Sequence, residues 1–294
     1  MSNLSEPRGA SRGRRQGSTE NGDVDATQFS VTVAKALSIL EAFSPGGRPL
    51  GNAELVERTG LPKPTVSRLT YTLTRCGYLV FDLRHRNYEL GPRSLQLGAI
   101  ATSRISVPRI ARPKMEELGE LGFNVGLGLC DGNQMLYLDA VEGKALVGLR
   151  LYAGSRMPVL TTAMGRAYLC ALPEQARRGM IASLKESVDP ARWDLVERKL
   201  VESFVQFDEL GYCASMGEWH SDINGVAAPI RGRETFVLNI GGPAYKMQAE
   251  DIIGSLGPAV ARAAQEIAAH VDVASDSPSR ALLRNARGEG QETA

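Results

Sequence analysis

Residues 52–77 read NAELVERTGLPKPTVSRLTYTLTRCG, and this stretch decides the fold of the N-terminal third of the chain. A short helix is predicted up to about Thr59. Gly60 follows at the position where the end of a helix favours a left-handed residue. The tight turn of residues 60–63 then leads into another helix that starts with Pro64, a favourable first helical residue. Two short helices joined by such a turn indicate a helix-turn-helix.

The helix predicted over residues 64–76 has two unlike faces. Val66, Leu69 and Leu73 are spaced three and four apart, so they are expected to pack inward. Residues 61–81 contain no acid, whereas a merely solvated helix more often shows Glu and Lys pairs. The outer face and the preceding turn therefore predict contacts with DNA bases and phosphates. The residues expected to make them are Lys63, Thr65, Ser67, Arg68, Tyr71, Thr72 and Arg75.

The segments on either side complete a winged helix. A first helix is predicted over about 31–44, and its apolar face is expected to consist of Val33, Leu37, Leu40 and Phe43. After residue 77, strands are predicted at 78–81 and 88–90, joined by a polar connection with Arg84 and Arg86 at its tip. Such a basic hairpin can reach the DNA backbone or minor groove. A three-helix interaction module without a DNA partner is the alternative, and the missing acids favour DNA.

A length of 294 residues suits two domains or one large one, and the composition is that of an ordinary soluble protein. The net charge of +1 is uneven, because residues 1–95 carry 13 Lys and Arg against 9 Asp and Glu, while the remainder has a small acidic excess. No apolar run is long enough to cross a bilayer and no signal peptide is evident, so a cytoplasmic protein without a membrane partner is expected. Four cysteines and three histidines are scattered along the chain. We therefore expect reduced thiols, no metal and no cofactor.

Beyond the hairpin the pattern changes to mixed α and β segments. Residues 93–121 are predicted to be helical with a break at Pro108. Strands are expected at 124–130, 135–141, 146–151, 226–230 and 235–241, and helices at 162–171, 174–186, 191–210 and 248–271. The resulting division is a disordered tail (1–27), a winged helix-turn-helix (28–91), a helical linker (92–121), an α+β domain (122–274) and a second disordered tail (275–294).

Many short motifs in this order resemble the IclR family of bacterial transcription regulators. The resemblance covers about residues 30–272 and is carried by Ala36–Phe43, Ala53-Glu54-Leu55, Thr59–Lys63, Gly77-Tyr78-Leu79, Asp139–Gly143, Thr162–Ala167, Ala227-Ala228-Pro229 and Gly242-Pro243. It departs at Pro64, where the family often has a serine that caps the helix.

The resemblance implies a C-terminal domain of the GAF or profilin type, which is a curved antiparallel sheet flanked by helices with an effector pocket on one face. It also implies a homodimer or homotetramer. A two-fold dimer would read a pseudo-palindromic operator in double-stranded DNA, with half-sites about one helical turn or a multiple apart. The helices around 93–121 would link effector binding to DNA binding.

A candidate pocket lies at residues 160–165, which lead into a helix whose free N–H groups attract carboxylates. An ordinary capped helix is the alternative, and Thr162 is a candidate for both roles. The resemblance implies an apolar wall from Leu146 and Leu149 and helix-start contacts from Ala163 and Met164. Where glyoxylate-type sensors carry Asp, Cys and two Ser, this chain has Ser215, Gly225, Asn239 and Gly241.

These replacements remove much of a small polar cage. The two glycines enlarge the cavity, while Trp219 and Met164 add apolar surface. These replacements therefore predict a small-molecule effector that is a larger carboxylate than a two-carbon acid, and an aromatic acid is one candidate.

The loop 217–222 contains Glu, His and Ser but is not expected to be catalytic. Consecutive residues on an extended loop point in different directions, and no GxSxG motif is present. We therefore predict that the protein is not an enzyme and that this loop covers the pocket. The family resemblance implies a transcription regulator, with a catabolic pathway as the expected target. Two other hypotheses are a GAF-like enzyme with a fused partner-binding domain and a protein-binding adaptor.

Overall fold

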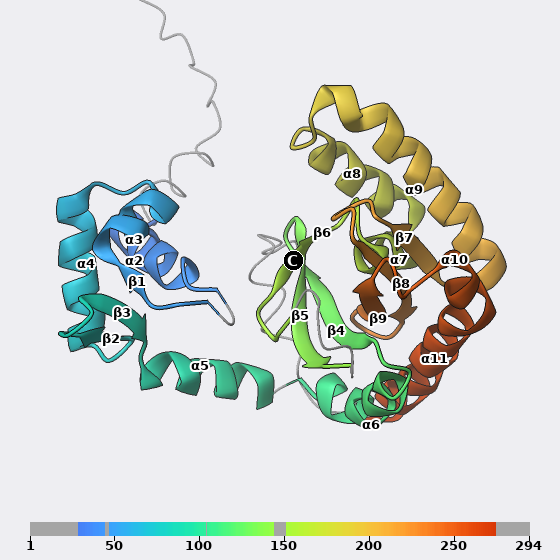
Figure 1. Cartoon of the computed structure of the whole chain (residues 1–294), viewed down its shortest axis with the longest axis horizontal. Coiled ribbons are helices and arrows are strands. Elements are labelled where there is room, and N and C mark those ends of the chain that lie inside the picture. Colours follow the sequence, from blue (N-terminus) through green and yellow to red (C-terminus); the bar gives the residue numbers. More distant parts are fainter. Residues whose placement is uncertain (1–28, 45–46, 104, 144–150, 275–294) are drawn as a thin grey trace, which may run out of the picture.

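The computed structural model describes residues 29–44, 47–103, 105–143 and 151–274 (Figure 1). Both predicted tails, and most of the strand expected at 146–151, lie outside these residues. Helix α5 (Pro92–Ser103) connects the N-terminal elements to the larger α+β part of the chain (Figure 1).

The N-terminal elements form a winged helix-turn-helix, as predicted. They are α2 (Val31–Glu41), β1 (Leu50–Gly51), α3 (Asn52–Thr59), α4 (Lys63–Arg75), β2 (Leu79–Asp82) and β3 (Asn87–Leu90), with the strands paired antiparallel in the order β1-β3-β2. The three inward residues predicted on α4 are buried, and Leu55 of α3 packs against them. Gly60 ends α3 with a φ of 66°, which is the left-handed conformation that glycine adopts without strain.

The apolar face predicted for the first helix is wrong in part. Ile39 is the residue of α2 that is fully buried, and Leu40 and Phe43 pack around it. Val33 and Leu37 are 56% and 51% exposed. Only one side of this short helix reaches α3 and α4, so apolar residues one turn nearer its start lie on a different face. Strand β1 was also missed, because two residues are too few to show an alternating pattern.

The larger part is built on a six-stranded antiparallel sheet in the order β6-β5-β4-β9-β8-β7. Its strands are β4 (Asn124–Asp131), β5 (Gln134–Val141), β6 (Arg156–Pro158), β7 (Cys213–Met216), β8 (Ile223–Ile230) and β9 (Phe236–Pro243). The helices are α6 (Val107–Gly119), α7 (Ala163–Ala171), α8 (Glu174–Lys185), α9 (Pro190–Leu210), α10 (Ala249–Asp251), the π-helical segment η1 (Ile252–Leu256) and α11 (Gly257–Ala274). The predicted strands outside 146–151 are confirmed, whereas the three- and four-residue strands β6 and β7 were missed.

Strand alternation gives the two faces of this sheet different roles. On β9, Phe236, Leu238 and Ile240 join the core beneath α6 and α11. The residues between them, Val237 and Asn239, lie on the opposite face, which α7 covers. Because successive side chains of a strand point to opposite sides, a single strand contributes both to the core and to a pocket.

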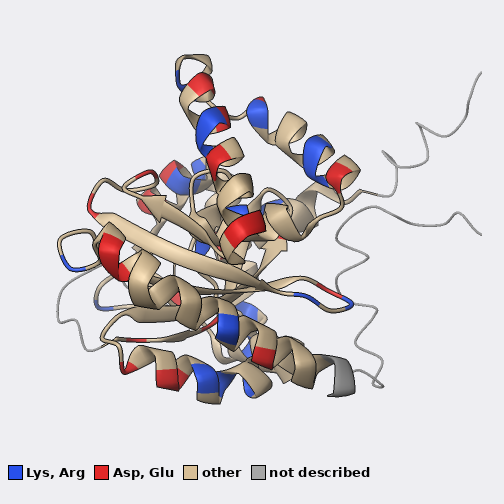
Figure 2. Cartoon of the chain, turned by 90° about the vertical axis from the view of Figure 1, so that its right-hand side faces the viewer, with Lys and Arg blue, Asp and Glu red and all other residues tan. Residues whose placement is uncertain are grey.

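Helix α11 and the preceding turns carry the apolar stripe that the sequence predicted at 252–267. Its members are buried against the sheet, although a π-helical turn occupies the start of the run. Charged residues lie mostly on helices and loops, and β7, β8 and β9 contain none (Figure 2). Among the described residues, no helix has the length and apolar character needed to cross a membrane.

Candidate functional site

The outer face of α4 is solvent-exposed along its length. Tyr71 is 67% exposed and lies between Arg68 and Arg75, which are also exposed. Lys63, Ser67 and Thr72 share this exposure, and only Thr65 is half-buried. The structure therefore gathers the residues predicted to contact DNA on one accessible helix face.

The cations of this face have no ionic partners. Within the described part of the chain, Lys63, Arg68 and Arg75 form no salt bridge, and the same holds for Arg84 and Arg86 in the hairpin. Their charges are therefore available to phosphates or to guanine, the base to which arginine binds with two hydrogen bonds. The Thr72 hydroxyl donates to the Arg68 carbonyl oxygen over 3.0 Å, which leaves this side chain as an acceptor towards an incoming base.

The hairpin between β2 and β3 is organised by Asp82. Its Oδ1 accepts hydrogen bonds from the N–H groups of Arg84 and His85 at 2.7 and 3.2 Å, and its Oδ2 lies 2.7 Å from His85 Nδ1. The hydrogen bond with His85 is the main reason that the pKa of Asp82 is lowered. The carboxylate therefore stays ionised and holds the turn that presents Arg84 and Arg86.

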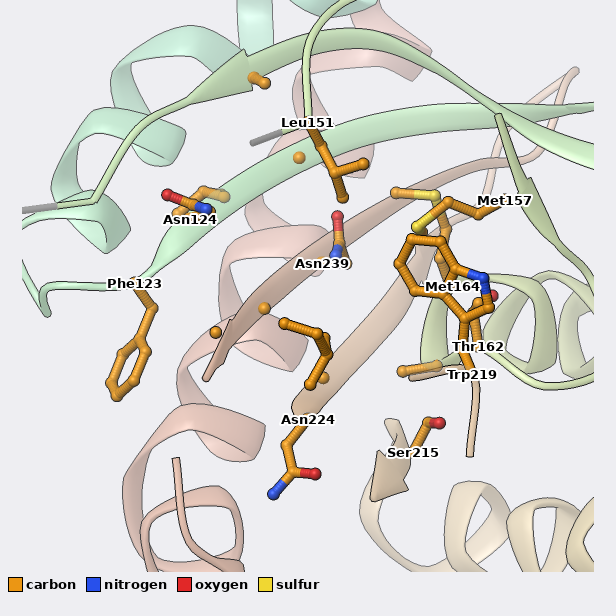
Figure 3. A pocket seen from close by; sticks show the side chains of 18 of the residues that line it. Phe123, Asn124, Leu151, Met157, Thr162, Met164, Ser215, Trp219, Asn224 and Asn239 are labelled. Carbon is orange, nitrogen blue, oxygen red and sulfur yellow. The ribbon is translucent and has the colours of Figure 1, made fainter. Parts of the chain in front are cut away.

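A pocket opens on the α7 face of the six-stranded sheet (Figure 3). Every described residue predicted to contact the effector lines it: Thr162, Ala163, Met164, Ser215, Trp219, Gly225, Asn239 and Gly241. Leu146 and Leu149 lie outside the described residues. The sequence did not single out Tyr137, Leu151 or Met157, which also line this pocket. The alternation of side chains along β5 could have placed Tyr137 on this face of the sheet. Nothing in the sequence, however, indicated that its hydroxyl lies beside the pocket.

The start of α7 provides hydrogen-bond donors at one end of the pocket. Thr162 caps the helix, because its Oγ1 accepts the Gly165 N–H at 3.1 Å and donates to the Pro158 carbonyl oxygen at 2.7 Å. The N–H groups of Ala163 and Met164 precede the first intrahelical acceptor, so α7 itself cannot satisfy them. A carboxylate oxygen is the natural acceptor for such a pair, and the helix dipole favours its negative charge.

The pocket floor is formed by glycines that the protein's own packing does not require. A Cβ atom at Gly225 would have its nearest neighbour at 3.5 Å, and one at Gly241 at 3.7 Å, both ordinary contacts. By contrast, a Cβ at Gly126 would lie 2.1 Å from the Tyr137 ring and one at Gly165 would lie 2.1 Å from the Val159 carbonyl oxygen. The space above Gly225 and Gly241 therefore remains free for a ligand.

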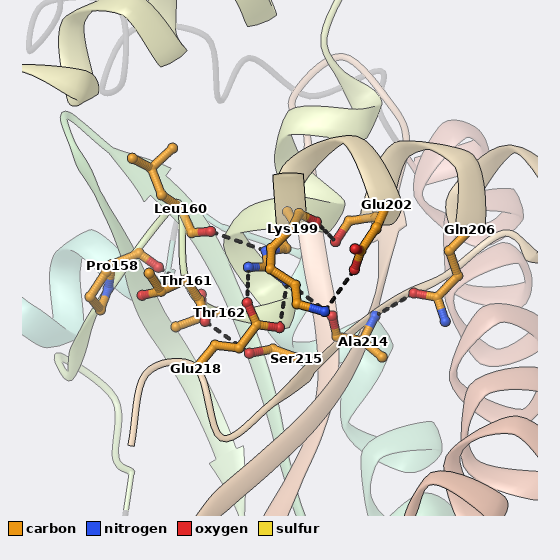
Figure 4. A network of polar contacts seen from close by, with 12 residues as sticks. Pro158, Leu160, Thr161, Thr162, Lys199, Glu202, Gln206, Ala214, Ser215 and Glu218 are labelled. Atoms are coloured by element: carbon orange, nitrogen blue, oxygen red, sulfur yellow. Dashed lines mark hydrogen bonds and ion pairs between the residues drawn. The ribbon is translucent and has the colours of Figure 1, made fainter. Parts of the chain in front are cut away.

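A buried ion pair that the sequence did not reveal holds the loop 217–222. The Arg166 side chain is 1% exposed and forms a two-pronged salt bridge with Glu218, with Nη1 2.9 Å from Oε1 (Figure 4). Its Nε also donates to the Leu160 carbonyl oxygen at 3.0 Å. Arg166 lies on α7, and Glu218 directly precedes the pocket residue Trp219. These contacts tie the loop to the helix whose start faces the pocket.

Two cysteines meet although 43 residues separate them. The sulfur atoms of Cys170 and Cys213 are 3.5 Å apart in the core beneath α7. The hydrogen bond with Cys170 and burial raise the pKa of Cys213, so its thiol stays protonated. Cys130 is buried and Cys76 is exposed. Within the described ranges, no group of three or more His, Cys, Asp or Glu side chains is arranged to hold a metal ion.

Comparison with known proteins gives consistent matches over both parts of the chain. Residues 32–83 match the IclR helix-turn-helix domain, and residues 99–269 match the bacterial transcriptional regulator IclR C-terminal domain. The HTH-type transcriptional regulator TsaQ1/TsaQ2 of Comamonas testosteroni is 34% identical over 249 residues, which cover 83% of this chain and 89% of that protein.

Solved structures give the same result. The crystal structure of an IclR family transcriptional regulator from Brucella abortus is 34% identical, with a TM-score of 0.69, over 86% of this chain and 97% of that one. An IclR homologue from Microbacterium hydrocarbonoxydans, crystallised in complex with 4-hydroxybenzoate, shares the fold at 19% identity and a TM-score of 0.65, over 83% of this chain and 100% of that one.

Proposed function

The chain belongs to the IclR family of bacterial transcriptional regulators, and from this premise we propose that a carboxylate bound beside α7 controls its attachment to an operator. It is a DNA-binding regulator and not an enzyme, since the matched relatives are named as transcriptional regulators. We further propose that residues 28–91 bind DNA, that residues 122–274 bind the effector and that the protein acts in the cytoplasm.

The exposed, acid-free face of α4 with its unpaired arginines is the observation that carries the DNA proposal. In this proposal α4 enters the major groove, with Arg68 and Tyr71 towards base edges, while Arg84 and Arg86 of the wing bind the backbone or minor groove. Sequencing the genomic fragments that the protein retains would identify the operator. Recovery of fragments without a common motif would argue against sequence-specific regulation.

Arg68→Ala is expected to weaken binding to that operator by about 1–3 kcal/mol, because a bidentate arginine contact to a base is worth that much. Fluorescence anisotropy with labelled operator measures the change. Arg192→Ala is the matched control, since this residue is an exposed arginine on α9, far along the chain from the proposed DNA-binding face. Equal affinities for wild type and Arg68→Ala would contradict the assignment of α4 as the recognition helix.

The shape and chemistry of the pocket support an aromatic carboxylate as effector. The N–H pair of Ala163 and Met164 supplies an anion site, and Met157, Met164 and Trp219 surround the adjoining space with sulfur and ring atoms (Figure 3). The glycine floor leaves more room than a two-carbon acid fills. A protein of the same fold holds 4-hydroxybenzoate, which supports this size and class.

Calorimetry tests the effector proposal directly. We expect benzoate-type acids to bind the full-length protein and glyoxylate to bind weakly or not at all. The reverse order of affinity would reject an aromatic effector. To control transcription, the ligand must bind with different affinity to the conformation that binds DNA and to the conformation that does not. The affinity of the protein for its operator should therefore change when the acid is added.

A second copy of the chain is the proposed partner of α5. None of the twelve residues of α5 is buried, and Leu95, Leu97 and Ile100 are 76%, 54% and 50% exposed. Residues 94–103 carry no charge. An isolated helix of this length is marginal in water, so burial against the α5 of another chain supports both its stability and a two-fold dimer. A homotetramer formed from two such dimers is also compatible with this contact.

A further inference from the structure

Asn239 is a buried polar residue of the pocket whose side-chain amide is only partly hydrogen-bonded among the described residues. It lies on β9 between the buried Val237 and Gly241, and it is 7% exposed. Its Nδ2 atom is 3.7 Å from the position that a Cβ of Gly241 would take. Among the described residues, this Nδ2 has no hydrogen-bond acceptor. The amide therefore directs its donor into the space above the glycine floor.

Tyr137 determines which end of the Asn239 amide faces the pocket. Its hydroxyl donates to Asn239 Oδ1 at 3.0 Å, and this contact joins β5 to β9 across the intervening strand β4. Burial raises the pKa of Tyr137 above its ordinary value, so the phenol keeps its proton. With the amide reversed, that proton would be buried without an acceptor, which is costly. The donor end of Asn239 is thus held towards the ligand.

From this geometry we propose that Asn239 selects effectors that carry a hydrogen-bond acceptor at the end opposite their carboxylate. The inference rests on the proposed function of the pocket and narrows its ligand class to aromatic carboxylates with an oxygen acceptor, such as a carbonyl, across the ring. Tyr137 is the positioning residue, since it acts on the ligand only through the orientation of Asn239.

The two glycines connect the start of α7 with the Asn239 amide. Ala163 Cβ at the start of α7 is 3.7 Å from the Cβ position of Gly225, and Gly225 is paired directly with Gly241 across β8 and β9. The Asn239 Nδ2 atom lies 3.7 Å from the Cβ position of Gly241. We therefore place a benzoate over the two glycines, with its carboxylate at α7 and its para substituent towards Asn239.

Four para-substituted acids test the proposal with the full-length protein. Benzoate reports the pocket itself, 4-formylbenzoate adds an acceptor, 4-methylbenzoate adds an apolar group and 4-aminobenzoate adds mainly a donor. Calorimetry should give 4-formylbenzoate a Kd about tenfold lower than those of the methyl and amino acids, as expected for one hydrogen bond that would otherwise be unsatisfied.

Two variants distinguish the orientation of the Asn239 amide from the packing of the pocket. Asn239→Leu should abolish the preference for 4-formylbenzoate. Tyr137→Phe leaves Asn239 in place but free to turn, so the affinity ratio between 4-formylbenzoate and 4-aminobenzoate should fall from about tenfold towards one. Tyr212→Phe is the matched control, because this buried tyrosine belongs to the core on the opposite face of the sheet. It should keep the wild-type ratio.

The outcomes separate this inference from the function on which it rests. If the protein binds benzoate but shows no para preference, or if Tyr137→Phe keeps the full ratio, the role of Asn239 is refuted while the effector pocket stands. If none of the four acids binds, the aromatic effector and the inference are both overturned. Thermal unfolding of each unliganded variant confirms that the ratios are measured on folded protein.

Discussion

At the scale of single residues, Gly225 and Gly241 differ from the other glycines of the sheet. Position 126 requires glycine because the Tyr137 ring leaves no room for a Cβ atom. A Cβ atom at position 225 or 241 would meet only ordinary contacts. Glycine also lowers strand stability, because it has no side chain to pack. Glycine at these two positions is therefore not required by the fold, but it keeps the space above the pocket floor open.

Gly241→Val should consequently block the effector without unfolding the protein. The added side chain fills the space where the ring of an aromatic acid would lie, so we expect benzoate affinity to fall at least tenfold while the unfolding temperature stays close to that of wild type. Calorimetry and thermal unfolding measure the two quantities. Gly179→Val is the matched control on the exposed surface of α8. Undiminished binding by Gly241→Val would show that the ligand lies elsewhere.

The reactivity of the cysteine thiols tests which of them are buried. Iodoacetamide at pH 8 should alkylate Cys76 in the folded protein and spare Cys170 and Cys213, because both are buried and the pKa of Cys213 is raised. Peptide mass spectrometry gives the extent of labelling at each site. In denaturant all the cysteines should react. Rapid labelling of Cys213 in the native protein would mean that the core beneath α7 opens readily.

At the scale of elements, the loop 217–222 owes its position to the charge pair between Arg166 and Glu218. A guanidinium that is 1% exposed is tolerated because a carboxylate and backbone carbonyl oxygens surround it. The pair joins α7 to the loop that carries Trp219. The same interaction therefore supports both the fold and the wall of the pocket.

Glu218→Ala should destabilise the protein by about 3–5 kcal/mol, since removal of one partner leaves a buried charge uncompensated. Urea unfolding measures this loss, and benzoate affinity should fall with it as the loop loosens. Combining the change with Arg166→Met should recover much of the stability, because no buried charge then remains. Glu174→Ala, which breaks an exposed pair with Arg178, should have little effect. Comparable losses in the two single variants would contradict the special role of the buried pair.

Elements with a long, regular pattern were predictable, and contacts between distant segments were not. The three- and four-residue spacing of Val66, Leu69 and Leu73 was sufficient to orient α4. Strands β1, β6 and β7 have two to four residues, too few for periodicity to stand out from chance. The bond from Tyr137 to Asn239 spans 102 residues of sequence, and no local pattern encodes it. The pocket positions came from family resemblance and not from periodicity.

At the scale of the whole molecule, α5 is the element that the single chain leaves without support. Its exposed leucines predict an assembly of at least two copies, as proposed above, and light scattering after gel filtration measures the mass. Leu95→Glu combined with Ile100→Glu should shift the protein towards a monomer, because charges would have to be buried in the interface. Leu83→Glu alters an equally exposed leucine at the tip of the wing and should leave the mass unchanged. A wild-type monomer at micromolar concentration would exclude this role of α5.

One face of the six-stranded sheet lines the pocket and the other face packs in the core, and this separation has a consequence for how such regulators diversify. Gly225 and Gly241 line the pocket, so a change at either would alter the proposed recognition of an effector, while the neighbouring Val226, Leu238 and Ile240 belong to the core on the reverse side. Substitution at these two glycines can therefore reshape the pocket at little cost in stability, because an added Cβ meets only ordinary contacts. A scaffold of this kind can thus accommodate a different effector while the residues of its helix-turn-helix stay the same.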